Sequence, residues 1–324
     1  MITARILGTG SVLSGRQVST EEVVRRALPG KDAARLAERI GIWNRYWVED
    51  SATASGLAAE AGRKALETAG CDARDVRRLI FVSSTSGDTV SPANAHAVAE
   101  ALGLDDSCDG FDINNACTGF LSALDVAARS VATGLGPVLI TVSELFSRFI
   151  SPEEPRPYLV LADAAAAVLV GPGREGEGFL ASHLRCSADV RGKVMLPHPG
   201  FRGQRSHFRF DATYEEMTDG ALGLIQSASQ RVLDEAGVAL RDVEWFVPHQ
   251  PNGRMLETLL ERMAVSPERV MPVVGEIGSV GAASIPVSLD RLMRGPGVRP
   301  GQRLLMTAVG AGTGFGAMLY RVGG

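Results

Sequence analysis

The 324-residue sequence predicts an α/β protein built from two similar halves. Apolar segments rich in β-branched residues alternate with Ala-rich helical segments along the whole length, a pattern typical of an α/β fold with buried strands. An internal repeat and a Gly-rich stretch near the middle divide the chain. A hydrophobic content of 45% and a charged content of 22% are those of a globular protein with a large core.

The clearest strands are two continuous apolar runs in the first half of the chain. They are Leu-Ile-Phe-Val at residues 79–82 and Val-Leu-Ile-Thr-Val at residues 138–142. Neither run alternates regularly with polar residues, so each strand is expected to be buried on both faces. The sequence therefore predicts a sheet that is covered by helices on its two sides.

A helix that ends at Ala-Gly, followed by an acidic loop and an apolar strand, occurs once in each half. Glycine suits the end of a helix because it adopts the left-handed conformation without steric strain. The Gly-rich stretch at 171–178 reads as a surface linker. We interpret the repeat as an internal duplication, with an N-terminal half over 1–172 and a C-terminal half over 173–324. The alternative is a common helix-to-strand pattern that recurs by chance. At one constant offset, close to half the chain length, the residues Leu66, Ala69, Gly70, Asp75 and Val76 recur as Leu233, Ala236, Gly237, Asp242 and Val243.

Composition narrows the possible functions. The net charge of −4 and the isoelectric point near 5.8 argue against general binding to nucleic acids or membrane surfaces. No apolar run approaches the length that spans a bilayer. The four cysteines form no Cys-x-x-Cys pair, so the sequence predicts neither a zinc site nor a disulfide framework. We expect a cytoplasmic protein with reduced thiols.

Cys117 lies on a predicted sharp turn between a strand-like and a helix-like segment. The start of a helix favours a thiolate, because unpaired N–H groups and the helix dipole stabilise negative charge there. Small neighbours, Ala116 and Gly119, leave room for an acyl group. The plain alternative is a buried cysteine that acts as a small hydrophobic residue.

His249 follows the strand-like segment at 245–248. Ligands usually bind at the carboxyl ends of strands in α/β sheets, which makes His249 a second catalytic candidate. The alternative is a histidine that only bonds a nearby carbonyl group. Two Gly-rich loops follow, at 275–286 and 308–316, and the second could supply N–H groups to an oxyanion. Neither loop has the Gly-x-Gly-x-x-Gly pattern in a dinucleotide-binding context, so no dinucleotide cofactor is expected.

Four blocks occur in a fixed order along the chain. They are Asp-x-x-x-Ala-Cys-x-Gly-Phe at 112–120, His249 with Gln250 and Asn252, and Gly-rich blocks at 278–286 and 310–316. In order and spacing they resemble the β-ketoacyl-acyl-carrier-protein synthase III family over nearly the whole chain. The resemblance implies a thiolase-like fold with five αβαβα layers, a homodimer, and catalytic roles for Cys117 and His249. It also implies thioesters of coenzyme A or phosphopantetheine as substrates, acyl carrier protein as a partner, and no permanently bound cofactor or metal.

Ser279 departs from the family pattern, which has a catalytic asparagine at this position. In the family, the histidine and asparagine donate hydrogen bonds to a malonyl thioester and stabilise the enolate formed on decarboxylation. Losing one such donor typically costs ~10²–10³ in rate. Two reactions therefore stay open after Cys117 is acylated. One is decarboxylative condensation in fatty-acid or polyketide biosynthesis, and the other is acyl transfer to a hydroxyl, amine or thiol.

The resemblance also assigns binding roles to several positions, for which solvated surface residues are the plain alternative. Arg35 replaces a tryptophan that stacks on the adenine of coenzyme A, and the cationic run 201–209 is a candidate contact for an acidic carrier. Ser91 stands where the family often has a phenylalanine that gates the acyl pocket across the dimer interface. The assigned residues are Arg39, Asn252 and Arg254 for coenzyme A or the carrier, and Gly310, Gly312, Thr313 and Ser91 for the oxyanion and acyl pocket.

A noncatalytic partner subunit of a ketosynthase complex is the alternative from another functional class. It is disfavoured because Cys117 and His249 are both present. A degradative thiolase is also disfavoured, because its second cysteine would lie in the block at 310–316, which contains none.

Overall fold

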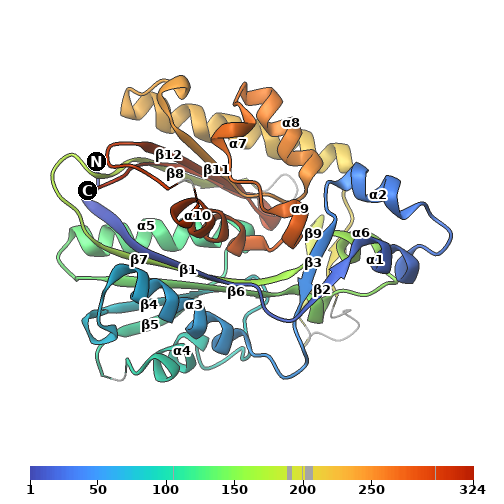
Figure 1. The fold of residues 1–324 in the computed structure, drawn as a ribbon, viewed down its shortest axis with the longest axis horizontal. Helices are drawn as coiled ribbons and strands as arrows, with labels where there is room; N and C mark the ends of the chain where they lie inside the picture. Colours follow the sequence, from blue (N-terminus) through green and yellow to red (C-terminus); the bar gives the residue numbers. More distant parts are fainter. Residues whose placement is uncertain (105, 188–191, 199, 201–206, 296) are drawn as a thin grey trace.

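The computed structural model describes residues 1–104, 106–187, 192–198, 200, 207–295 and 297–324. Two mixed β-sheets lie one above the other, with helices between them and on both outer sides (Figure 1). The order is helices, sheet, helices, sheet, helices. The predicted α/β fold with five αβαβα layers is therefore confirmed.

The first sheet has the strand order β1-β7-β6-β4-β5. Strand β4 is parallel to β5 and β6, whereas β7 is antiparallel to β6 and β1. Every residue of β6 is buried, and so are all but the last of β7, which explains the continuous apolar runs in the sequence. The strands are β1 (Ala4–Val12), β4 (Arg78–Val82), β5 (Asp109–Ile113), β6 (Val138–Leu145) and β7 (Asp163–Pro172).

The second sheet has the strand order β11-β12-β13-β8. Strands β11 and β12 are parallel, and β13 is antiparallel to both β12 and β8. All four strands come from the second part of the chain: β8 (Gly178–Cys186), β11 (Trp245–Pro248), β12 (Arg303–Val309) and β13 (Gly314–Arg321).

The central helix layer is formed by α5 (Gly119–Ala132) and α10 (Ser284–Arg294), which lie between the sheets (Figure 1). Alternate residues of β4 belong to the hydrophobic cores on the two opposite faces of the first sheet. Ile80 and Val82 pack in the core of the central layer, while Leu79 and Phe81 pack in the core beneath the outer helices. The outer helices are α3 (Ala54–Ala69) and α4 (Asn94–Leu102) on the first sheet, and α7 (Tyr214–Ala236) and α8 (Gly253–Met263) on the second.

The two predicted helix ends have the same geometry. Helix α3 stops at Gly70, with φ of 61°, and α7 stops at Gly237, with φ of 63°. Both glycines are left-handed, and each N–H donates to carbonyl groups of the last helical turn. The same helix ending therefore precedes a strand in each of the two sheets.

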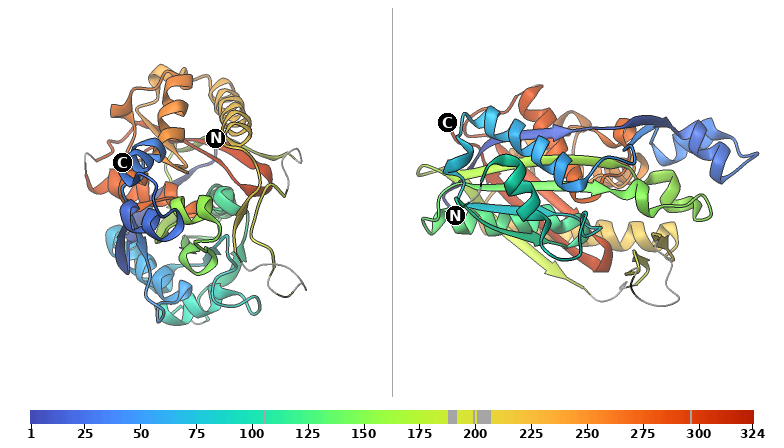
Figure 2. Two further views of the ribbon diagram at one scale, coloured as in Figure 1. Left: turned by 90° about the vertical axis from the view of Figure 1, so that its right-hand side faces the viewer. Right: turned by 90° about the horizontal axis from the view of Figure 1, so that it is seen from below.

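Shorter elements gather at one end of the layers, away from the two termini (Figures 1 and 2). There, the fully buried side chain of Arg45 on β3 donates hydrogen bonds to Thr20 Oγ1 of α1 and to the Leu159 carbonyl of α6. The shorter elements are β2 (Arg16–Ser19), α1 (Thr20–Ala27), α2 (Ala33–Ile40), β3 (Asn44–Trp47), α6 (Pro155–Val160), β9 (Val194–Met195), β10 (Arg209–Phe210) and α9 (Val274–Ile277).

None of the described helices is long and apolar enough to cross a membrane.

Candidate active site

Cys117 lies in a 3-10 turn, η2 (Ala116–Thr118), between strand β5 and helix α5. The turn begins at Ala116, whose positive φ of 45° is uncommon for a residue with a side chain. Gly310 from the second sheet packs directly on this turn. A Cβ at Gly310 would lie 3.0 Å from the backbone N of Cys117, so only glycine fits there without displacing the turn.

The start of a helix favours a thiolate at Cys117, whereas the surroundings of this thiol in the structure favour its neutral form. Burial raises the pKa of the thiol to about 12, and the nearby Glu144 raises it further. The N–H groups of Cys117 and Ala311 act in the opposite direction but do not overcome these effects. Cys117 therefore rests as a neutral thiol and needs a base in order to react.

His249 follows β11 directly and is only 4% exposed. Its backbone N–H donates to the Thr307 carbonyl at 2.8 Å, which holds it beside β12. Within the described part of the chain, its buried Nδ1 has no hydrogen-bond partner. Burial lowers the pKa of the imidazole to about 4, so the ring is neutral at physiological pH and can accept a proton.

Gln250 fixes the position of the His249 loop. Its backbone N–H donates to Ser284 Oγ at 3.0 Å, and its side-chain oxygen accepts from the N–H groups of Val273 and Val274. Its amide nitrogen donates to the Met271 carbonyl at 2.9 Å. Gln250 is thus a structural support, because its side-chain oxygen and nitrogen both bond neighbouring segments.

Ser279 is 5% exposed and lies between α9 and the 3-10 turn η6 (Gly281–Ala283). Its N–H donates to the Val160 carbonyl at 2.8 Å, and its carbonyl accepts from the Ala162 N–H at 2.9 Å. These two bonds attach the Ser279 loop to the segment before β7. The position of Ser279 is therefore set by residues from the first part of the chain.

The turns that carry these residues meet between the two sheets. The Cys117 turn η2 contacts η6, which follows Ser279, and η7 (Ala311–Thr313), which follows Gly310. It also contacts β12, the strand that holds His249. The structure thus brings the candidate catalytic segments together from both sheets.

In the loop at 310–314, the backbone N–H of Ala311 acts on the Cys117 thiol. The N–H of Gly310 donates to the Gly314 carbonyl and that of Thr313 to the Gly310 carbonyl, so both are already used within the loop. Gly312 is exposed, with φ of 74°. The N–H of Ala311 lowers the pKa of the Cys117 thiol, and sequence reasoning named Ala311 only as part of this loop.

The predicted binding residues lie at the surface around the site. Gly41 packs on Gly253, and this contact places Arg39 and Arg254, both exposed, near the same surface. Asn252 caps α8 by accepting a hydrogen bond from the Met255 N–H at 2.8 Å, so its side-chain oxygen has a structural role.

Ser91 is exposed on the loop before α4 and precedes a cis peptide bond to Pro92. Its predicted gating role requires a second copy of the chain. In the cationic run 201–209, residues 201–206 lie outside the described residues.

Glu144 is a further buried group at the site that sequence reasoning missed. It lies near the end of β6 and is completely buried, and its carboxylate faces the Cys117 thiol closely enough to raise the pKa of that thiol. The signal in the sequence was a single acidic residue within the apolar run that ends Val-Ser-Glu-Leu-Phe at 142–146. Among the described residues, no group of three or more metal-binding side chains could hold an ion.

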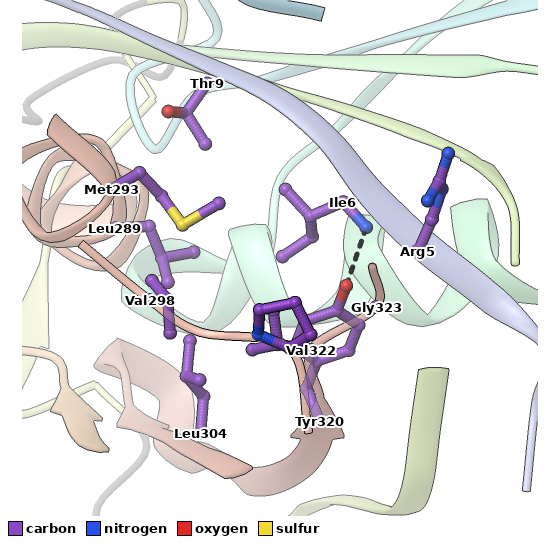
Figure 3. Close-up of a pocket in the computed structure, with 11 residues that line it drawn as sticks. Arg5, Ile6, Thr9, Leu289, Met293, Val298, Leu304, Tyr320, Val322 and Gly323 are labelled. Atoms are coloured by element: carbon purple, nitrogen blue, oxygen red, sulfur yellow. Dashed lines mark hydrogen bonds between the residues drawn. The ribbon is translucent and has the colours of Figure 1, made fainter. Parts of the chain in front are cut away.

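A cavity of about 210 Å³ lies elsewhere, between β1, α10 and the second sheet (Figure 3). Its lining includes Ile6 and Tyr320, joined by a hydrogen bond from the Ile6 N–H to the Tyr320 hydroxyl, and Leu304. Leu304 pairs with the first residue of β11, whereas His249 follows the last. The cavity therefore lies at the end of the second sheet where β11 begins, whereas the catalytic segments lie at the end where β11 stops.

A neutral resting thiol predicts a distinctive pH dependence for alkylation of Cys117. Only the thiolate reacts with iodoacetamide, and its fraction rises about tenfold per pH unit below the thiol pKa. We expect the rate at the Cys117 peptide, followed by mass spectrometry, to rise by about 10²-fold or more from pH 6 to pH 9. A constant rate over this range would indicate a thiolate–imidazolium pair and contradict the assignment.

The chain is similar in sequence to one family of known proteins. Residues 111–188 match the family model of 3-oxoacyl-[acyl-carrier-protein] synthase III, and residues 233–322 match the model of its C-terminal part. A β-ketoacyl-[acyl-carrier-protein] synthase III of Rhizorhabdus wittichii is 34% identical over 99% of this chain and 100% of its own length.

Solved structures agree with these matches over the whole fold. The 3-oxoacyl-(acyl carrier protein) synthase III of Pseudomonas aeruginosa superposes with a TM-score of 0.91 at 28% identity and covers 99% of both chains. A priming β-ketosynthase from a polyketide biosynthetic pathway superposes with a TM-score of 0.90 at 27% identity, covering 99% of this chain and 96% of its own. The predicted thiolase-like fold is thereby confirmed.

Proposed function

Because the chain belongs to the β-ketoacyl-[acyl-carrier-protein] synthase III family, a family of acyltransferases, we propose that Cys117 accepts an acyl group from a thioester of coenzyme A or of acyl carrier protein. The main support is the meeting of a thiol, a neutral imidazole and the Ala311 N–H between the two sheets. Similarity to the named synthases supports the choice of this substrate class.

Acylation begins with transfer of the thiol proton from Cys117 to His249. The sulfur then attacks the thioester carbonyl, and a tetrahedral oxyanion forms. The N–H groups of Cys117 and Ala311 stabilise this negative charge. The carbon–sulfur bond to the leaving thiol then breaks, the proton returns from His249 to that thiol, and the acyl group stays on Cys117.

The second half-reaction is proposed to be decarboxylative Claisen condensation, as the names of the related synthases imply. A malonyl thioester loses carbon dioxide, and its enolate carbon attacks the acyl-Cys117 carbonyl. The carbon–sulfur bond to Cys117 then breaks, the β-ketoacyl thioester leaves, and the released thiolate takes up a proton from solvent. His249 donates to the enolate oxygen. Ser279 is the second hydrogen-bond donor in this scheme, and its side chain is shorter than that of the family's asparagine.

Transfer to a hydroxyl, amine or thiol acceptor is the second candidate reaction, and Ser279 is the observation that favours it. In this case His249 takes a proton from the acceptor, which attacks the acyl-Cys117 carbonyl. No enolate forms, so no second donor is required. The two reactions share the acyl-enzyme and differ only in the acceptor.

A Ser279→Asn variant separates the two reactions. We expect it to release carbon dioxide from a malonyl thioester about 10²-fold faster than the wild type, because asparagine restores a longer donor. Ser279→Ala is the matched control and should be no faster than the wild type. An unchanged rate in Ser279→Asn would contradict the idea that Ser279 limits decarboxylation.

Binding of the donor is proposed to use the exposed surface around Arg39 and Arg254, which suits phosphates of coenzyme A or acidic groups of a carrier. Trp43, 51% exposed, lies close by, since its N–H donates to the Gly275 carbonyl and Gly275 is near Gly41. A homodimer would bring Ser91 of the second copy to the acyl pocket. A noncatalytic partner subunit, by contrast, would not form an acyl-enzyme with any thioester.

A further inference from the structure

The carboxyl group of Glu144 is bound by hydrogen-bond donors alone. Oε2 accepts from the Ser84 N–H at 2.9 Å, and Oε1 accepts from the Ser84 hydroxyl at 2.6 Å and from the Ala282 N–H at 3.1 Å. No ion pair to Glu144 is present within the described residues. A buried carboxylate without a cation is costly, so its presence needs an explanation.

The donors to Glu144 come from both parts of the molecule. Ser84 follows β4 of the first sheet, whereas Ala282 belongs to η6, the turn after Ser279. Glu144 itself is in β6. Gly281 is packed closely against Glu144, since a Cβ there would lie 3.0 Å from Oε1 and 2.6 Å from the Phe146 ring. The carboxyl group thus joins the Ser279 loop to the first sheet.

The same carboxyl group acts on the nucleophile. Its negative charge disfavours a thiolate at Cys117, whose turn contacts η6. Burial raises the pKa of Glu144 to about 7, and the carboxylate of Asp163 on β7 adds to this, while the hydrogen bonds from Ser84 and Ala282 lower it. When Oε1 of Glu144 is protonated, it can donate a hydrogen bond to Ser84 Oγ, and the Ser84 hydroxyl then accepts instead of donating.

We propose that Glu144 is a positioning residue for Cys117: its carboxyl group holds the Ser279 loop against the Cys117 turn, and gain or loss of its proton changes the charge that faces the thiol. This inference rests on the proposed role of Cys117 as nucleophile. When Glu144 is protonated, the thiol ionises more easily. When Glu144 is ionised, the thiol keeps its proton until His249 removes it.

The alkylation rate of Cys117 by iodoacetamide, measured from pH 5 to pH 10, tests this inference. In the wild type, the logarithm of the rate should rise along two parallel lines that are separated by a flatter region near pH 7. In this region Glu144 ionises and raises the pKa of the thiol. The line above pH 7 is therefore displaced to lower rates than an extension of the line below pH 7 would give. A displacement of about tenfold corresponds to one pKa unit, a typical effect of a neighbouring charge.

The Glu144→Gln variant should show one straight line without the flatter region. At pH 9 it should react about tenfold faster than the wild type, and at pH 5 at a similar rate. An amide places its NH₂ against a backbone N–H in either orientation, so the variant also loses one hydrogen bond. Glu144→Asp keeps the charge and should keep the flatter region.

Two further variants make the test independent of folding defects. Ser84→Ala removes the hydroxyl donor that lowers the pKa of Glu144, so the flatter region should move to higher pH. Glu60→Gln, at an exposed carboxylate on α3, should reproduce the wild-type profile. A single line in the wild type, or the same flatter region in Glu144→Gln, would overturn the inference.

Failure of this inference is distinguishable from failure of the proposed function. Iodoacetamide reports on the thiol without any substrate, whereas the proposed function fails only if thioesters do not acylate Cys117. An acylated Cys117 with a single-line profile would overturn the role of Glu144 alone.

Discussion

A Cys117→Ala variant is expected to lose acyl transfer almost completely. Loss of an attacking nucleophile removes the covalent intermediate, and in enzymes with a nucleophile and a base such a change costs at least about 10⁴-fold in rate. Neither His249 nor the Ala311 N–H can replace the missing sulfur. The rate is measured as release of coenzyme A from an acyl-coenzyme A, coupled to a thiol reagent, with each acceptor in turn.

Cys71→Ala is the matched control, because Cys71 is also a free cysteine but lies in the outer layer, beside α3. It should retain the wild-type rate. If Cys117→Ala released coenzyme A as fast as the wild type, a different nucleophile would carry the reaction.

A His249→Ala variant is expected to slow acylation by about 10²–10⁴-fold, the usual contribution of a general base. The effect should be large because the thiol rests in its neutral form, with a pKa of about 12, and does not lose its proton unaided at neutral pH. Acylation is followed in single turnover by quenching and intact-protein mass spectrometry.

His96→Ala serves as the control for His249, since His96 is an exposed histidine on α4. Raising the pH should partly restore acylation in His249→Ala, because hydroxide then takes over removal of the thiol proton. Equal rates for His249→Ala and the wild type at neutral pH would show that the thiol is activated in another way.

Much of the fold can be predicted from the sequence because its strands are buried on both faces. The runs at 79–82 and 138–142 are apolar except for Thr141, and in the structure their alternate apolar residues belong to two different cores. The glycines that end α3 and α7 are equally readable, since only a left-handed residue continues the chain at those points.

The ionisation state of Cys117 could not be predicted from its neighbours along the chain. The start of a helix stabilises a thiolate, but helix α5 begins only at Gly119, and the sulfur is buried near Glu144. Glu144 is brought there by the pairing of β6 with β4 and by hydrogen bonds to Ser84 and Ala282. These effects come from residues that are distant in sequence, so only the folded structure shows them.

The roles of single residues within the loop at 310–316 also depend on the folded structure. Glycines mark the loop at 310–316 in the sequence, which drew attention to Gly310, Gly312 and Thr313. In the structure, Gly310 is needed for close packing on the Cys117 turn, and two of these three residues use their N–H groups inside the loop. The N–H of Ala311 lowers the pKa of the Cys117 thiol, and Ala311 has no sequence feature to distinguish it.

The central claim, that Cys117 carries the acyl group, is tested most directly by mapping that group on the wild-type protein. The protein is incubated briefly with an acyl-coenzyme A, quenched in acid, and digested for peptide mass spectrometry. We predict one acyl group per chain, on the peptide that contains Cys117. An acyl group on the exposed Cys186 instead, or release of coenzyme A without any acylated peptide, would contradict the account.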